Sequence, residues 1–467
     1  MKRTGWIGRG FALAALAALA MLSGCASHER AEPKLTAEQV AQNVASFDMA
    51  WERIRDKHFD EKLGGVDWVA AREELRPKVE QAETMSAARE AISELIARLG
   101  LTHFGVIPAE LTSDMGADAP EAGAEKSDAA KKEASEDAER GVPGIDTRVF
   151  GDELLVIEVT PGSPAERAGI RPGWKIVKIA GVDVQPTIER LRESVTGLDR
   201  LEMSAHGLFQ RRLSRPVGES ARVAFLDQKD QFVELDVESV EPQGVVARLG
   251  NLPPFHIVLE ERELPGGIAY VRLNAWFAPA KIMPHLEQIM RARKSAPGIV
   301  FDLRGNPGGI GAMSMGAAGW FVRESKYDLG TMKTRKDALR FVVNPRPAAY
   351  EGPLAILIDG CTGSTSEIFV GGMQDMQRAR LFGRRTAGAA LPSVVEKLPN
   401  GDGLQYAFAD FIRPNGKRLE GVGVEPDVSI TPTRAQLLAG QDPVLDAAVT
   451  WLRSAPKPAV RAARAVN

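Results

Sequence analysis

The sequence predicts an α/β protein (α+β in the order of its parts) with an N-terminal helical region, an inserted β-domain and an α/β layered core. Three observations support this prediction. Residues 36–99 carry apolar side chains at three- and four-residue steps, which is typical of helices. Residues 142–240 contain short strand-like runs separated by glycine turns. From Leu264 onward, strand-like and helix-like segments alternate, which indicates a layered core.

The composition is that of a globular protein. The chain has 467 residues, of which 44% are hydrophobic and 26% charged. This length allows about three domains, and the apolar content supports a sizeable core. A net charge of -3 argues against a nucleic-acid partner, for which a basic face is expected.

The first 25 residues are predicted to be a targeting signal. Basic residues precede an apolar run from Phe11 to Leu22, which is too short to span a bilayer comfortably. The ending Leu22-Ser23-Gly24-Cys25 resembles the bacterial lipobox, which implies cleavage and lipid attachment at Cys25. An ordinary secretory signal with an incidental cysteine is the alternative.

The lipobox resemblance implies a location on the periplasmic side of a bacterial membrane. Ala26-Ser27 lack the aspartate linked to inner-membrane retention, so a lipid anchor in the outer membrane is expected. Residues 26–35 would form a tether. Lipidation of Cys25 leaves Cys361 without an intrachain partner, so no disulfide framework is predicted.

Residues 36–112 are predicted to form two or three packed helices and then a short strand at Val106 and Ile107. The apolar positions that repeat at helical spacing are Val40, Val44, Phe47, Trp51, Ile54, Ile92, Leu95, Ile96 and Leu99. Residues 113–141 are rich in Ala, Glu, Asp, Lys and Ser, which predicts a flexible, mostly acidic linker.

Residues 142–241 are predicted to be the inserted β-domain. The expected strands cover residues 154–159, 176–179, 221–226 and 232–237, with a helical turn at 165–168 and a helix at 187–195. The polar segment from Thr196 to Pro216 has no assigned structure.

Residues 242–453 are predicted to be the α/β core, followed by a C-terminal tail at 454–467. The expected strands cover residues 268–273, 299–303 and 354–358, and the expected helices cover 279–293 and 442–452. A glycine turn, Asn306 to Gly309, precedes the apolar segment 313–321.

The turn after the strand at 354–358 is open to two interpretations. Ser364-Thr365-Ser366-Glu367 fits a capping box, with Ser364 as the N-cap and Glu367 reaching back. A hydroxyl at a helix N-terminus, beside unpaired backbone N-H groups, also suits a nucleophile whose attack creates an oxyanion. The local sequence favours the cap, because caps are far commoner than nucleophiles.

No metal or cofactor is predicted. The sequence has no His-Glu-x-x-His, no paired Cys-x-x-Cys and no carboxylate cluster at ligand spacing. The glycine turn at Asn306 is not followed by Gly-Lys-Ser/Thr, so it does not form a phosphate loop.

The string from Val159 to Val184 resembles the PDZ module. The resemblance implies a groove in which backbone N-H groups around Gly144, Ile145 and Asp146 hold a peptide's C-terminal carboxylate while the peptide adds a strand to the sheet. A domain that serves only as a spacer is the alternative.

The core resembles the C-terminal processing, or tail-specific, serine peptidases, and within them the tricorn-core branch. The motifs that carry the likeness are FDLRGNPGG (301–309), GSTSEIFVGGMQD (363–375), GRRTAGA (383–389) and EGVGVEPD (420–427). By this match Ser364 is the nucleophile. Processing peptidases use a lysine one residue after the glycine of Thr-x-Gly, a place that Ala389 holds here.

The tricorn-like branch implies a different base. It uses a histidine in a Ser/Thr-His pair, matched here by Thr102-His103, and a glutamate matched by Glu420. An unperturbed pKa near 6.5 suits His103 to take the Ser364 proton. Glu420 would orient His103 directly or through Thr102, although a solvated turn glutamate is the alternative.

The resemblance also implies an oxyanion site made of backbone groups. The expected donors are the N-H of Thr365 and one N-H from Gly308 or Gly309, where glycine permits close approach. The other histidines, His28, His58, His206, His256 and His285, match no family motif.

These expectations describe a periplasmic, lipid-anchored serine endopeptidase that captures polypeptide C-termini and cleaves through an acyl-enzyme. Ala389 motivates an alternative, a catalytically silent peptide-binding lipoprotein. Two weaker options are a core that binds apolar ligands and a base at another lysine such as Lys397. The sequence makes no prediction of natural substrate, cleavage preference or oligomeric state.

Overall fold

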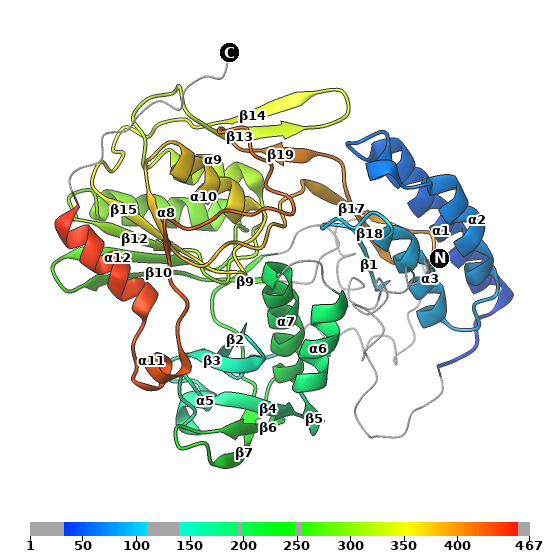
Figure 1. Ribbon diagram of the computed structural model, residues 1–467, viewed down its shortest axis with the longest axis horizontal. Helices are drawn as coiled ribbons and strands as arrows, with labels where there is room; N and C mark the ends of the chain where they lie inside the picture. Colours follow the sequence, from blue (N-terminus) through cyan, green and yellow to red (C-terminus); the bar gives the residue numbers. More distant parts are fainter. Residues whose placement is uncertain (1–31, 110–139, 195–197, 248–254, 456–467) are drawn as a thin grey trace, which may run out of the picture.

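The computed structural model describes residues 32–109, 140–194, 198–247 and 255–455 (Figure 1). The predicted signal with Cys25, the linker residues 113–139 and most of the predicted tail lie outside these ranges. Within them, none of the helices combines the length and the apolar character that a bilayer span requires.

Three helices form the N-terminal region, as predicted: α1 (Ala37–Lys57), α2 (Trp68–Glu80) and α3 (Met85–Ala97). Each begins at a side-chain cap, supplied by Thr36, Asp67 and Thr84 respectively. The short 3-10 helix η1 (Leu63–Gly65) connects α1 to α2. These caps explain why the helices start where they do.

A small sheet joins this helical region to the C-terminal half of the chain. Strand β1 (Gly105–Ile107) pairs antiparallel with β18 (Gly403–Ala407), which pairs with β17 (Ser393–Lys397). Leu404 and Tyr406 of β18 lie in one apolar cluster with the buried faces of the helices. Figure 1 shows β1 and β18 beside α3. The segment just before β1, which contains His103, is therefore fixed against residues from the other end of the chain.

The inserted domain contains a six-stranded sheet in which five strands follow the order β2-β3-β4-β6-β7 and the sixth, β5, pairs with β4. Its elements are β2 (Ile145–Phe150), β3 (Glu153–Val159), α5 (Pro164–Arg167), β4 (Lys175–Ile179), β5 (Val182–Asp183), α6 (Gln185–Ser194), α7 (Leu198–Leu213), β6 (Ser220–Leu226) and β7 (Phe232–Glu238). The predicted strands and the helix α6 are confirmed within a few residues.

Helix α7 occupies the segment that the sequence left unassigned. Its apolar residues Leu201, Ala205, Phe209 and Leu213 recur at four-residue steps and lie in the core of the inserted domain. Charged and polar residues occupy most of its other positions, although Met203 and Leu208 are apolar.

The core sheet has the order β10-β11-β12-β15-β16-β20, in which only the β10–β11 pair is antiparallel. The strands are β10 (Leu259–Leu264), β11 (Ile268–Leu273), β12 (Ile299–Asp302), β15 (Leu354–Ile358), β16 (Arg380–Gly383) and β20 (Val428–Ser429). Helices α8 (Pro279–Ala292), α9 (Gly311–Ala318) and α10 (Thr365–Asp375) pack in the larger apolar cluster, and α12 (Pro443–Ser454) packs on the opposite face. The predicted α/β layering is confirmed.

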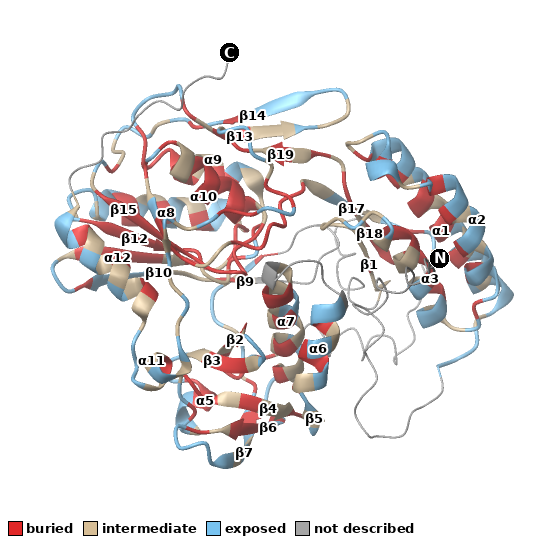
Figure 2. Ribbon diagram, viewed as in Figure 1, coloured by how far each residue is buried: buried red, intermediate tan, exposed pale blue. Residues whose placement is uncertain are grey.

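Strand β15 is buried on both faces (Figure 2). Leu354, Ile356 and Ile358 face the larger cluster, whereas Ala355 and Leu357 pack with α12. This alternation explains the continuous apolar run, because a parallel strand between two helical layers has no solvated side.

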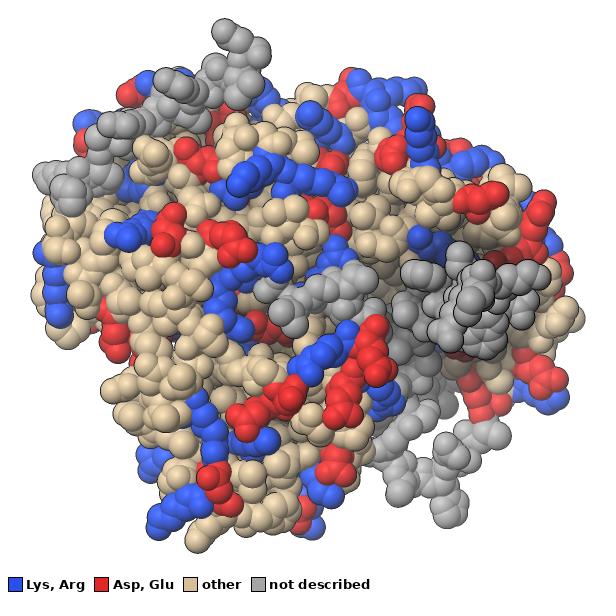
Figure 3. All heavy atoms as spheres, in the orientation of Figure 1, with Lys and Arg blue, Asp and Glu red and all other residues tan. Residues whose placement is uncertain are grey.

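Several short elements were not predicted. Among them are the sheet β14-β13-β19, made of β13 (Asp328–Lys333), β14 (Ala338–Val342) and β19 (Asp410–Ile412), the pair β8 (Val245–Ala247) and β9 (Phe255–Ile257), and helix α11 (Arg434–Leu438). On the face drawn in Figure 3, basic and acidic side chains are interspersed.

We expect Phe369→Ala to destabilise the core. Phe369 is fully buried and its ring lies 5.4 Å from the ring of Trp276 and 5.6 Å from that of Phe301. Truncation leaves a cavity that costs about 3–5 kcal/mol of unfolding free energy, measurable by urea denaturation. Phe232→Ala is the matched control, because Phe232 is 60% exposed; its effect should stay within about 0.5 kcal/mol. Equal effects of the two variants would contradict this account.

Candidate active site

Ser364 lies in a strained turn between β15 and α10. It is the N-cap of α10, with φ 51° and ψ -118°, a conformation that residues other than glycine rarely adopt. Glu367 reaches back, and its Oε2 accepts the Ser364 N-H at 3.0 Å, as the capping pattern predicts. The same N-H also donates to the Ala389 carbonyl at 2.8 Å. The serine is therefore held by its backbone.

Glu367 is a fully buried carboxylate that gathers a loop around the serine. It accepts the Thr386 hydroxyl at 2.6 Å and the N-H groups of Gly388 and Ala389 at 2.8 and 2.9 Å. Burial raises the pKa of Glu367 to about 7, against the lowering effect of these donors. The loop thus places Ala389 next to Ser364, but with only a methyl side chain.

Gly308 lies against the turn at Ser364. A Cβ at this position would lie 2.6 Å from Ser364 Cβ and 2.9 Å from Thr365 N, and φ is 108°. Buried Asn306 fixes the approach: its Oδ1 accepts the Gly308 N-H and its carbonyl accepts the Gly363 N-H, both at 3.0 Å. Only glycine fits such a contact.

The backbone donors near Ser364 are unequal. The Gly308 N-H already donates to Asn306, whereas the N-H groups of Gly309 and Thr365 have no acceptor among the described residues. Of the two glycines expected as donors, Gly309 is therefore the one that remains available to an oxyanion.

His103 is held by a relay of two residues. Its Nδ1 lies 2.9 Å from Thr102 Oγ1, which donates to Glu420 Oε2 at 2.8 Å. Because the threonine hydroxyl gives its proton to the carboxylate, it accepts from Nδ1, which leaves Nε2 free to accept a proton. His103 itself has a φ of 60°, so both candidate reactive residues have a rare backbone conformation.

Glu420 is buried, with 3% exposure, so its interpretation as a solvated turn glutamate is wrong. It also accepts the N-H groups of Thr102 at 2.9 Å and Ala390 at 3.1 Å. Arg200 of α7 donates to its Oε1 at 3.2 Å. Both oxygens of this buried side chain therefore have hydrogen-bond partners.

The surroundings favour the neutral form of His103. Burial lowers the pKa of His103, the Glu420 charge raises it, and the Arg200 charge lowers it; the net direction is downward. A neutral imidazole is the form that can act as a base.

The two halves of the site meet at Ala389 and Ala390. Ala389 is hydrogen-bonded to Ser364, and the next residue, Ala390, is hydrogen-bonded to Glu420. In the described structure no hydrogen bond joins Ser364 to His103 directly. The alternative base Lys397 is exposed at the end of β17.

The other histidines have different settings. His58 and His206 each contact a backbone carbonyl through Nδ1, that of Asp60 and that of Thr147 respectively. His28 lies outside the described residues. Neither described contact involves the residues around Ser364.

Strand β2 lies at one edge of the inserted domain's sheet, and part of its backbone already contacts side chains. The Thr147 carbonyl accepts from Arg148 at 2.9 Å and contacts His206 Nδ1 at 3.1 Å. Asp146 accepts from Arg148 at 2.7 Å. At Gly144, with φ 81°, a Cβ would lie 2.2 Å from Ser163 Cβ. The predicted ligand-binding residues thus lie together, but a ligand strand would have to displace side chains here.

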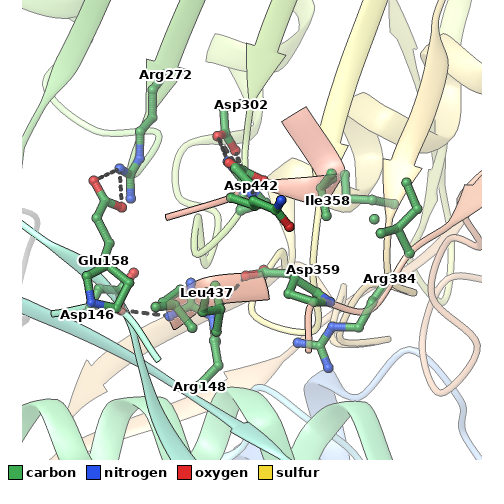
Figure 4. A pocket seen from close by; sticks show the side chains of 18 of the residues that line it. Asp146, Arg148, Glu158, Arg272, Asp302, Ile358, Asp359, Arg384, Leu437 and Asp442 are labelled. Atoms are coloured by element: carbon green, nitrogen blue, oxygen red, sulfur yellow. Dashed lines mark hydrogen bonds and ion pairs between the residues drawn. The ribbon is translucent and has the colours of Figure 1, made fainter. Parts of the chain in front are cut away.

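A pocket of about 290 Å³ lies between the inserted domain and the carboxyl ends of the core strands (Figure 4). Most of its charges are paired: Arg272 with Glu158, Arg304 with Asp302 and Asp442, and Arg148 with Asp359. Arg262 instead lies over the ring of Tyr270. The pocket is therefore charge-balanced.

Three potential metal ligands lie close together in the described part of the chain. Glu202, Asp359 and Cys361 each offer a ligand atom within 4.8 Å of the others. Arg148 donates to Asp359 at 2.9 Å, Arg384 donates to Glu202, and burial raises the pKa of the Cys361 thiol. Two guanidinium groups and a protonated thiol do not fit a cation site.

Three family models match the chain. The peptidase family S41 model matches residues 267–430, the tricorn protease C1 domain model residues 40–97, and the PDZ domain model residues 155–196.

Individual proteins match as well. A "Carboxyl-terminal-processing protease" of Synechocystis is 25% identical over 81% of this chain and 78% of its own. A "Probable CtpA-like serine protease" of Staphylococcus aureus is 25% identical over 63% of this chain. That match covers 53% of its length, so this chain spans about half the length of that relative.

Among solved structures, a photosystem II D1 C-terminal processing protease matches with a TM-score of 0.55 and 19% identity, covering 91% of this chain and 100% of that one. At this identity the likeness concerns the fold. The S41, tricorn and PDZ matches cover the core, the helical region and the inserted domain in turn. Together, the three family models and the processing-protease relative support the family of C-terminal processing, or tail-specific, serine peptidases for this chain.

Proposed function

We propose that this protein is a serine endopeptidase in which Ser364 is the nucleophile and His103 the general base. The observation that carries the proposal is the hydrogen-bonded chain from His103 through Thr102 to Glu420, which meets the Ser364 turn at Ala389 and Ala390. A buried carboxylate, a relay hydroxyl and a neutral imidazole are the parts that activate a serine.

In the first step, Ser364 Oγ attacks the scissile carbonyl and its proton passes to His103 Nε2. The charge that forms on the carbonyl oxygen would be stabilised by the N-H groups of Thr365 and Gly309. Glu420, acting through the Thr102 hydroxyl, stabilises the imidazolium and holds the tautomer.

In the second step, the carbon-nitrogen bond breaks and His103 returns the proton to the leaving amine. This leaves an ester on Ser364, which water hydrolyses with His103 again as the base. Ala389 takes no part in proton transfer, because a methyl group cannot accept a proton; its backbone positions Ser364 instead.

The substrates we propose are polypeptides with free C-termini. The inserted domain matches the PDZ model. A PDZ domain binds a polypeptide's C-terminus as an additional strand at the edge of its sheet. Gly144, Ile145 and Asp146 would hold the carboxylate. Binding should be weaker for a C-terminally amidated peptide than for its free-acid form, as fluorescence anisotropy can measure; equal binding would count against this role.

We also propose that Cys25 carries a lipid anchor, which places the protein on the periplasmic side of the bacterial outer membrane. The support is the lipobox-like ending of the signal sequence. Membrane fractionation tests it: Cys25→Ala should move the protein out of the membrane fraction.

A second candidate is a catalytically silent peptide-binding lipoprotein. Two observations favour it: Ala389 stands where processing peptidases have lysine, and no hydrogen bond joins Ser364 to His103 among the described residues. In that case, unstructured polypeptides would bind without being cleaved.

A fluorophosphonate probe tests the nucleophile. We expect one adduct on the wild-type protein and none on Ser364→Ala, as read by intact mass, because Ser364 would be the only activated hydroxyl of the turn. Ser366→Ala is the matched control: its hydroxyl accepts the Trp276 indole N-H at 2.8 Å, and its loss should leave labelling in place. An adduct that survives Ser364→Ala would overturn the assignment, and no adduct at all would favour the silent protein.

The base is tested by kinetics. His103→Ala should lower kcat/KM by about 10² to 10⁴, whereas Lys397→Ala should leave it unchanged. Normal cleavage by His103→Ala would instead point to another base.

The pH profile provides a separate test. Because burial lowers the pKa of His103, the imidazole stays neutral to lower pH, and the acid limb of kcat/KM should lie below about pH 6.5. The pKa of Glu367, about 7, lies in the same region, so the profile of Glu367→Gln separates the two groups. An acid limb well above pH 6.5 in both proteins would contradict the assignment.

A further inference from the structure

Helix α7 of the inserted domain reaches both halves of the candidate active site. Its buried stripe faces the core of its own domain, as described above, and its N-terminal turns contact the peptidase core. Arg200, Glu202 and Met203 make these contacts, and none of them belongs to the apolar stripe.

On the nucleophile side, α7 packs against the turn that precedes Ser364. A Cβ at Gly363 would lie 2.4 Å from Met203 Cε, and one at Gly360 would lie 2.3 Å from Glu202 Oε2. Glu202 is buried and accepts a hydrogen bond from Arg384, which follows β16. The helix is therefore seated directly on the turn.

On the base side, Arg200 donates from Nη2 to Glu420 Oε1 at 3.2 Å. The Glu420 side chain is 1% exposed and that of Arg200 18% exposed, so this ion pair is largely shielded from solvent. A carboxylate buried this deeply is costly to keep ionised without a cationic partner. Glu420 also accepts the hydrogen bond that the Thr102 hydroxyl donates.

We propose that Arg200 is a positioning residue of the catalytic relay: it fixes the Glu420 side chain, which holds Thr102 and through it His103. The inserted domain then contributes a charge to the relay, in addition to any role in peptide capture. This inference rests on the proposed function of Ser364 and His103, and it goes beyond that function by assigning part of the machinery to the PDZ-like domain.

The charged groups that face His103 are Glu420 and Arg200. Removing Arg200 takes away one of the two causes that lower the pKa of the imidazole and leaves the opposing effect of Glu420 in place. Loss of a hydrogen bond to a charged group should also lower the rate by about 10- to 100-fold.

The test compares Arg200→Ala, Arg200→Lys and Arg211→Ala in the full chain. Arg211 lies on the same helix but is exposed, so its variant is the control. We expect Arg200→Ala to lower kcat/KM and the rate of fluorophosphonate labelling and to move the acid limb to higher pH. Arg200→Lys should recover part of both effects, and Arg211→Ala should match the wild type. Thermal unfolding of each variant shows whether the fold is retained.

A second measurement does not depend on turnover. In protein labelled with ¹³C-histidine, the titration of His103, assigned by its loss in His103→Ala, should move to higher pH in Arg200→Ala. An unchanged titration would overturn the proposal, as would a lower rate with an unmoved acid limb. A wild-type protein that cleaves nothing would refute the proposed function, whereas an active Arg200→Ala with wild-type kinetics would refute only this inference.

Discussion

The candidate site depends on the hydrogen bonds that the buried Glu367 carboxylate accepts. Four donors from two separate segments converge on it: the N-H of Ser364 and three groups from the loop at Thr386 to Ala389. Without this acceptor, several buried donors would lose their partner at once, at about 1–3 kcal/mol each. The carboxylate thereby sustains the strained conformation of Ser364, which a capping bond alone would not require.

The second constraint is long-range strand pairing. His103 belongs to the N-terminal region, yet it comes two residues before β1, which is paired with β18 near the other end of the chain. Glu420 lies beyond β18 and β19, and its bonds to Thr102 and Ala390 join three separate parts of the sequence. A slip in the β1–β18 register would displace Thr102 and His103, the proposed base, from Glu420, so the small sheet has a positioning role as well as a structural one.

The sequence predicted the parts of the structure that have a local signal. The β15–α10 unit followed from an apolar run and a capping pattern, and the three N-terminal helices from periodicity. Helix α7 was not assigned, because its apolar stripe is narrow and its other contacts are with residues far away in the chain. The side-chain partners of Glu420 could likewise not be predicted from sequence spacing; only the family resemblance indicated Thr102. The unavailability of the Gly308 N-H depends on the fold of Asn306, which no pattern encodes.

The replacement of lysine by Ala389 has a consequence for the geometry of the base. A lysine at this position would deliver its amine from the loop that Glu367 holds, within the same local unit as Ser364. Here that loop keeps its backbone bonds to Ser364 but has only a methyl side chain, so the base that we propose comes from another part of the fold. The imidazole of His103 can serve as this base only if its tautomer and its distance from Ser364 are fixed, although the two residues lie on different segments. The hydrogen bonds of Thr102 and Glu420 and the β1–β18 pairing would fix them. The serine-lysine arrangement is local, whereas the arrangement in this chain depends on the assembly of all three parts.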